Sequence, residues 1–111
     1  MPHYMVQFAY SADAWQALMR KPEDRTAALE SLAKQSGGRL VSVFYHFGEF
    51  DGTVVFEAPD DATVNAIVMA VLGSGALRAS RTTRLFTPKE VVEALGRAGK
   101  IVYASPTSGK K

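Results

Sequence analysis

The chain has 111 residues, 47% of them hydrophobic and 22% charged, which is the composition of an ordinary globular domain. It contains no cysteine, and this excludes disulfides, thiolate nucleophiles and thiolate-bound metals. The net charge is +2, but Arg97, Lys100, Lys110 and Lys111 supply four positive charges, so residues 1–96 carry about −2. Because that body has no basic stripe with interleaved aromatic residues, we expect no nucleic-acid partner.

The length predicts a single domain over residues 1–96, followed by a basic C-terminal arm at residues 97–111. The arm ends in a segment of Ser, Gly and Lys, so we expect it to be largely flexible. No run of 18 apolar residues occurs, and the first residues lack the basic start and long apolar stretch of a signal peptide. The sequence therefore predicts a cytoplasmic protein that does not associate with a membrane.

The first third of the chain predicts a strand followed by two helical segments. Residues 4–10 alternate large apolar side chains with smaller or polar ones, as a half-buried strand does. Ser11 is suited to cap a helix, and Pro22 interrupts that helix. A second helical segment restarts with the acidic residues 23–24 in its first turn, and the glycine pair 37–38 provides its stop.

Residues 39–59 form the clearest strand region of the chain. Two apolar runs rich in β-branched and aromatic residues flank the polar segment 48–52, which predicts a β-hairpin at the centre of a sheet. Both runs carry large apolar residues at successive positions: Val43, Phe44 and Tyr45 in the first, and Val54, Val55 and Phe56 in the second. A sheet built from such strands has no wholly solvated face, so each side needs a cover.

The second half predicts a helix, a strand and a last helix. An Asp at residues 60–61 caps the first of these helices, and residues 73–75 end it. Its apolar residues recur at helical spacing: Val64, Ile67, Val68, Val71 and Leu72. Residues 77–86 are extended and studded with Arg, which suits a sheet edge or a strand that faces a partner. Residues 87–90 form a capping box with Pro at the first helical position, so we expect a helix through about Leu95.

The order of elements is strand, helix, strand, strand, helix, strand, with one more helix at the end. This is the order of an α+β, ferredoxin-like split βαββαβ fold, in which a four-stranded antiparallel sheet carries its helices on one face. Because the strands are apolar on both faces, we expect a second copy of the chain to bury the open face. The sequence thus predicts a homodimer or a higher homo-oligomer, with a small cavity between the facing sheets.

The segment Gly48-Glu49-Phe50-Asp51 resembles the Gly-x-Tyr-Asp signature of the GYD-domain family, with a phenylalanine in place of the usual tyrosine. The resemblance extends to residues 44–47 before this segment, to residues 55–61 after it and to residues 81–87 near the end, and it covers most of residues 1–95. It implies a dimeric α/β barrel. The family has no well-defined biochemical activity that could be carried over to this chain. A shared fold by itself does not define a protein's chemistry.

His46 is the most interesting candidate for chemistry, because a histidine in an apolar strand can exchange a proton near neutral pH. With Ser42 and Phe44 it shares one face of its strand, which points toward the dimer cleft if Tyr45 points toward the helices. There it could act as a general base, as a metal or haem ligand, or as a hydrogen-bonded interface histidine. No paired-histidine spacing typical of a metal site occurs, so we expect neither a metal nor another cofactor.

Asp51 follows the aromatic residue of the hairpin. It could orient His46 or contact a ligand, but an Asp before Gly is also a common turn pair whose carboxylate accepts backbone N–H bonds. Phe50, beside it, belongs with Tyr45 among the candidate ligand contacts. Tyr45 could instead be a core residue with a hydrogen-bonded hydroxyl.

Glu57 carries a charge on an otherwise apolar strand. We expect it to pair with Arg81 or Arg84 on the last strand, in a structural role. If that pair lay in the cleft, either arginine could instead hold a carboxylate or a phosphate of a ligand.

These residues leave three functions open. The leading one is a small-molecule-binding dimer whose cavity lies between facing sheets. The second is a cofactor-free oxygenase or isomerase, with His46 as the base and Arg84 or Tyr45 stabilising an oxyanion. The third is an assembly module with a filled sheet face and no cavity. A binding protein needs a cavity with a few converging polar groups, an enzyme also needs a base placed in it, and an assembly module needs neither.

Overall fold

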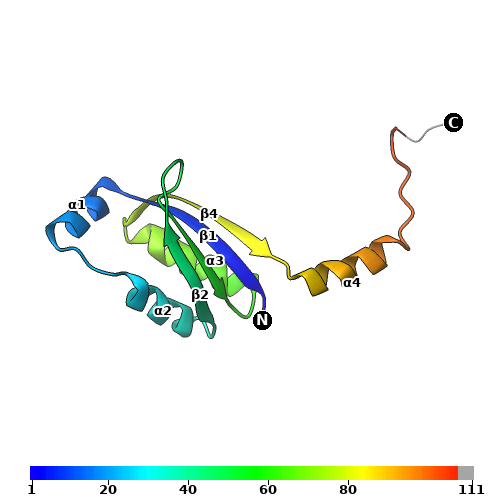
Figure 1. The fold of residues 1–111 in the computed structure, drawn as a ribbon, viewed down its shortest axis with the longest axis horizontal. Helices are drawn as coiled ribbons and strands as arrows, with labels where there is room; N and C mark the ends of the chain where they lie inside the picture. The colour runs from blue at the N-terminus through cyan, green and yellow to red at the C-terminus, as the bar shows by residue number, and fades with distance from the viewer. Residues whose placement is uncertain (108–111) are drawn as a thin grey trace.

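The computed structural model describes residues 1–107, which form one sheet and four helices (Figure 1). In chain order the elements are β1 (His3–Tyr10), α1 (Ala12–Arg20), α2 (Thr26–Gln35), β2 (Arg39–Tyr45), β3 (Gly52–Glu57), α3 (Asp61–Gly73), β4 (Leu77–Leu85) and α4 (Pro88–Ala98). Within these described residues, no helix is long and apolar enough to cross a membrane.

The sheet confirms the predicted ferredoxin-like fold. Its strand order is β2-β3-β1-β4, and every neighbouring pair is antiparallel. The predicted hairpin is β2 and β3, but only β3 lies inside the sheet, because β1 pairs with its other side. Strand β2 is therefore an edge strand, and the expectation that the whole hairpin forms the centre is wrong. The Arg-studded strand β4 forms the opposite edge, as its composition predicts.

The helix starts follow the predicted caps. The Ser11 hydroxyl accepts the Ala14 N–H at 3.1 Å, and an Asp60 carboxylate oxygen accepts the Thr63 N–H at 2.9 Å. Helix α2 differs from the prediction, because it begins at Thr26 rather than at residues 23–24. The Asp24 carboxylate accepts the Thr26 N–H at 2.9 Å from outside the helix, so this acidic residue closes the turn before α2 instead of lying in its first turn.

Helices α2 and α3 cover one face of the sheet, α2 against β2 and α3 against β4 (Figure 1). We call this the helix face and the other side the open face. The core on the helix face consists of alternate strand residues, the residue that follows β3 and one residue of α3: Tyr4, Phe8, Tyr10, Val54, Phe56, Ala58 and Val64. The alternation places their strand neighbours on the open face, where Met5, Gln7, Thr53 and Val55 are partly exposed and Ala9 at the end of β1 is buried.

Helix α4 projects away from the sheet beyond the end of β4 (Figure 1). Its capping box is formed as predicted, since the Thr87 hydroxyl accepts the Glu90 N–H and the Glu90 carboxylate accepts the Thr87 N–H. It runs to Ala98, slightly past the predicted end, and residues 101–105 that follow form no strand. The predicted flexibility of the arm concerns in part residues 108–111, which lie outside the described residues.

Gly38, just before β2, packs tightly against the end of β3, and a substitution there tests this packing. A Cβ at this position would lie 1.7 Å from the Glu57 carbonyl oxygen, a backbone atom that cannot yield without breaking the β2–β3 pairing. We expect Gly38→Ala to lower the free energy of unfolding by about 3 kcal/mol in urea denaturation. Gly73→Ala is the control, because nothing lies within 4 Å of its Cβ position and alanine favours a helix. Equal stability of the two variants would contradict this packing.

Candidate functional site

The open face is a sheet surface with an apolar centre. Residues that lie opposite each other on the four strands form rows across it: Phe44, Thr53, Gln7 and Arg81 in one row, and Ser42, Val55, Met5 and Thr83 in the next. Met5 and Val55 lie on the two central strands and are partly exposed, and Phe44 is 71% exposed. The open face thus carries a small exposed apolar cluster among polar side chains, which suits a contact surface.

His46 lies at one end of the open face. Its Nε2 atom is 2.7 Å from the Thr53 hydroxyl oxygen, and its backbone N–H donates to the Asp51 carbonyl oxygen at 2.8 Å. The Asp51 side chain points elsewhere, because its carboxylate accepts the Tyr10 backbone N–H at 2.9 Å. Asp51 therefore closes the end of β1 and does not orient the His46 ring.

Phe50 and Arg81 meet at the same end of the sheet. Phe50 is only 8% exposed, and the Arg81 guanidinium lies over its ring at 5.3 Å from the centroid. Arg81 also approaches the Glu49 carboxylate at 3.7 Å. Phe50 therefore packs the hairpin loop onto the sheet, and Arg81 covers it.

The predicted partner of Glu57 is wrong. The Glu57 carboxylate pairs with Arg39 at 2.5 Å and with His3 at 3.4 Å. These residues lie on β2 and β1, the two neighbours of β3 in the sheet, whereas β4 with its arginines lies beyond β1. Glu57 and its partners form an ion-pair cluster at the opposite end of the open face from His46.

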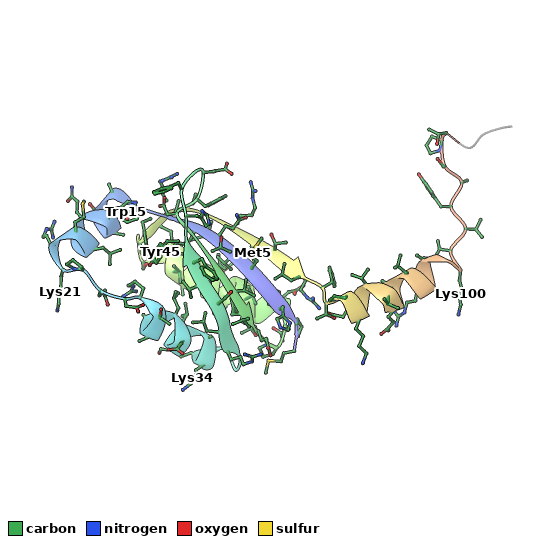
Figure 2. The ribbon with its side chains drawn as sticks, viewed as in Figure 1. Met5, Trp15, Lys21, Lys34, Tyr45 and Lys100 are labelled. Atoms are coloured by element: carbon green, nitrogen blue, oxygen red, sulfur yellow. The ribbon has the colours of Figure 1, made fainter. Side chains whose placement is uncertain are left out.

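Tyr45 and Arg84 lie on the helix face. The Tyr45 hydroxyl oxygen is 2.9 Å from the Tyr10 hydroxyl oxygen. Tyr45 is the last residue of β2 and is labelled in Figure 2. The Arg84 guanidinium lies over the Tyr4 ring at 5.7 Å and approaches the Glu90 carboxylate of α4 at 3.7 Å. Both side chains thus have structural partners.

The residues named from the sequence divide between the two faces of the sheet. His46, Phe50 and Arg81 belong to the open face, whereas Tyr45 and Arg84 belong to the helix face. The sheet separates the proposed base from both proposed oxyanion donors, so within one chain these groups do not converge on a common substrate.

A cavity that the sequence did not predict lies on the helix face. Its volume is about 380 Å³, and it lies between the sheet and helices α2 and α3 with one side open to solvent. Most of its lining is apolar, with Val6, Phe8, Val54 and Phe56 from the sheet. Small side chains face it from the helices and from β4: Ala28, Ala33, Ala70, Ser74 and Ser80. Small residues at positions that face a core are the sequence signal that could have indicated this space.

Tyr10 and Arg25 are the polar groups of the cavity with the most specific chemistry. Burial, and next the hydrogen bond with the Tyr45 hydroxyl, raise the pKa of Tyr10 well above its usual range. Its hydroxyl is therefore neutral at physiological pH and is able to donate a hydrogen bond. The Arg25 guanidinium is partly exposed and donates to Glu23 at 3.2 Å. Over residues 1–107, no three His, Asp or Glu side chains gather to hold a metal ion.

The sheet, its strand order and its one-sided helices define a ferredoxin-like α+β domain. Within that class, the chain belongs to the GYD-domain family, whose sequence profile matches residues 4–95. No curated protein matches the sequence.

Two solved structures are similar to the chain at low sequence identity. The crystal structure of MtbAldR is 18% identical, with a TM-score of 0.51 over 78% of this chain, and this chain spans about half (52%) of its length. The hypothetical protein PHS023 from Pyrococcus horikoshii is 10% identical, with a TM-score of 0.49 over 78% of this chain and 92% of its own. At these identities the likeness to MtbAldR shows the fold alone.

The role of Asp51 at the end of β1 can be tested by substitution. Asp51→Ala leaves the buried Tyr10 N–H without its acceptor, so we expect the free energy of unfolding to fall by about 1–2 kcal/mol. Asp51→Asn keeps an acceptor oxygen and should lose less. His46→Ala is the matched control from the same loop, and it should change stability by less than about 0.5 kcal/mol, because its side chain is exposed. Urea denaturation measures all three, and a larger loss at His46 would contradict these roles.

Proposed function

We propose that this protein is a small-molecule-binding domain that works as a homodimer. Each copy binds its ligand in the cavity between the sheet and helices α2 and α3, and the open faces of two copies pack together. The observation that carries the proposal is the cavity of about 380 Å³, which is large for a domain of 111 residues and is lined mostly by apolar side chains.

The cavity has the properties of a binding site for a small organic molecule. Such sites commonly have volumes of about 300–1,000 Å³, an apolar lining and a few polar groups that fix the orientation of the ligand. Here the apolar floor comes from β1 and β3, and the polar groups include the Tyr10 hydroxyl and the Arg25 guanidinium. This chemistry favours a compact, largely apolar or aromatic molecule that carries one carboxylate or hydroxyl group.

The open face supports the homodimer. Met5, Val55 and the exposed ring of Phe44 form an apolar surface that a second open face can cover. A twofold axis lets one self-complementary surface serve both copies. A space between the two facing sheets, where the sequence suggested the ligand, stays a prediction. It would be lined by the polar row that contains Gln7 and Thr53.

Binding is favoured over catalysis because the candidate catalytic groups do not converge. An oxygenase or isomerase with His46 as base needs an oxyanion donor within reach of the same substrate. Tyr45 and Arg84 lie across the sheet from His46, and their side chains already contact Tyr10 and Glu90. A purely structural assembly module is the other alternative, and it has no use for an apolar cavity on the helix face.

Filling the cavity tests the binding site. Ala28 lines the cavity from α2, whereas Ala27 next to it is exposed and does not line it. We expect wild-type protein to bind the anionic aromatic probe 1-anilinonaphthalene-8-sulfonate in the folded state, as a rise in fluorescence during titration. Ala28→Phe should weaken that binding at least about tenfold, because the ring occupies the space, and Ala27→Phe should bind like the wild type. Equal binding by both variants, or no binding by the wild type, would count against this site.

A charge in the centre of the open face tests the dimer. Val55→Asp would bury an unpaired carboxylate if two open faces meet, whereas in a single copy this position is partly exposed and tolerates the charge. We expect the variant to sediment as a monomer at concentrations where the wild type is a dimer. Asn65→Asp, on the exposed side of α3, is the control and should remain dimeric. A stable Val55→Asp dimer would rule out the facing-sheet arrangement.

A further inference from the structure

Helix α4 has an apolar side that is largely exposed in the single chain. Its residues separate into two sides at helical spacing, with Val91, Val92 and Leu95 on one side and Lys89, Glu93 and Arg97 on the other. The three apolar side chains are 45%, 67% and 64% exposed. Figure 2 shows the helix standing clear of the sheet, with side chains pointing into open space all around it.

Contacts of its first turn set the direction in which α4 leaves the sheet. Pro88 and the capping box set the first turn, and the Glu90 carboxylate of that turn also approaches Arg84 of β4. Arg84 in turn lies over the rings of Tyr4 and Phe86. The helix therefore continues away from the sheet beyond β4, held by the contact between Arg84 and Glu90, and does not fold back onto the sheet.

An exposed helix of this length needs a partner. Isolated helices shorter than about 12–15 residues are marginally stable in water, and α4 has 11 residues. Directly after it come Ile101, Val102 and Tyr103, which are also exposed. This stretch would add apolar surface to the same contact. Helix α4 and residues 101–103 thus form one projecting apolar segment, which we call the C-terminal arm.

The area of the open face indicates what the arm contacts. The β1–β3 ladder pairs six residues, so the paired face is about 20 Å long and, with four strands, about 19 Å wide. This is a projected area of roughly 400 Å² for each copy, whereas a standard specific interface buries about 800 Å² of accessible surface from each partner. The arm offers further apolar area to the same partner.

The charges are compatible with the same partner. The C-terminal arm, residues 88–103, contains three Lys or Arg and two Glu, a net charge of +1, whereas residues 1–87 contain eight Lys or Arg and nine Asp or Glu, a net charge of −1. The arm therefore meets no repulsion of like net charge from the body of another copy.

We propose that the C-terminal arm of each copy packs its apolar side against the second copy, and that the two exchanged arms complete the homodimer interface. This inference rests on the proposed dimer. It concerns an interaction surface outside the cavity, so ligand binding and arm exchange can fail separately.

The test removes the apolar side of α4 without changing charge or helix propensity. Val92→Gln combined with Leu95→Gln alters the apolar side, and Lys89→Gln combined with Glu93→Gln alters the polar side as a matched control. Sedimentation velocity of the full chain over a concentration series measures the dimer dissociation constant. We expect the first pair to raise it at least about tenfold, because two buried apolar contacts are lost, and the control pair to leave it within about twofold.

The outcomes separate the two proposals. A wild-type dimer whose dissociation constant is the same in both double variants would overturn arm exchange and leave the facing-sheet dimer standing. A wild type that is monomeric at all concentrations would overturn both. A second readout is fluorescence. Because the chain has no cysteine, Leu95→Cys and Glu93→Cys each introduce one thiol, which can be labelled with an environment-sensitive fluorophore. A blue shift on dimerisation at residue 95 alone supports the exchange, and equal spectra at both sites overturn it.

Discussion

The constraint on which this structure depends is that its strands are apolar on both sides while its helices cover only one. Core residues such as Phe8 and Phe56 face α2 and α3, and their neighbours Met5 and Val55 face outward. The residues that face the helices form the core of the domain, whereas those that face outward leave apolar surface exposed. A protein with this surface gains stability when a second copy covers it, because apolar area is removed from water without unfolding either copy.

The helices also cover the helix face of the sheet incompletely. Helices α2 and α3 pack mainly against the two edge strands, β2 and β4, and of their residues only Ala33 and Val64 are buried. The cavity lies between these helices, above Val6 and Val54 of the central strands. It follows that a ligand there would complete the packing of the domain as well as be recognised by it. The functional residues would then be ordinary core residues and two polar groups, Tyr10 and Arg25, rather than a constellation of catalytic side chains.

Much of the fold could be predicted from the sequence because local signals agreed with the tertiary structure. The caps at Ser11, Asp60 and Thr87, the alternation along β1 and the apolar runs of β2 and β3 marked the elements, and the element order indicated the ferredoxin-like topology. The partners of charged residues could not be predicted in this way. Glu57 pairs across to β1 and β2 because of strand order, which no local pattern contains.

The opposite faces of Tyr45 and His46 could be predicted from the alternation along β2, but the convergence of the candidate residues and the cavity on the helix face could not. A strand alternates sides at every residue, and β2 also carries an irregularity in its pairing between Leu40 and Ser42. Tyr45 therefore lies on the helix face and His46 at the end of the open face, one residue apart and on opposite sides of the sheet. The direction of α4 was likewise beyond the sequence, because its amphipathic pattern fits its own body and a partner equally well.

The measurement that tests the central claim most directly is native mass spectrometry of the full chain purified from its own cells. We predict a dominant species of two chains, with added mass from a retained small molecule that disappears when the protein is denatured. A bare single chain of 12.0 kDa as the dominant species would contradict both the covered open face and the occupied cavity.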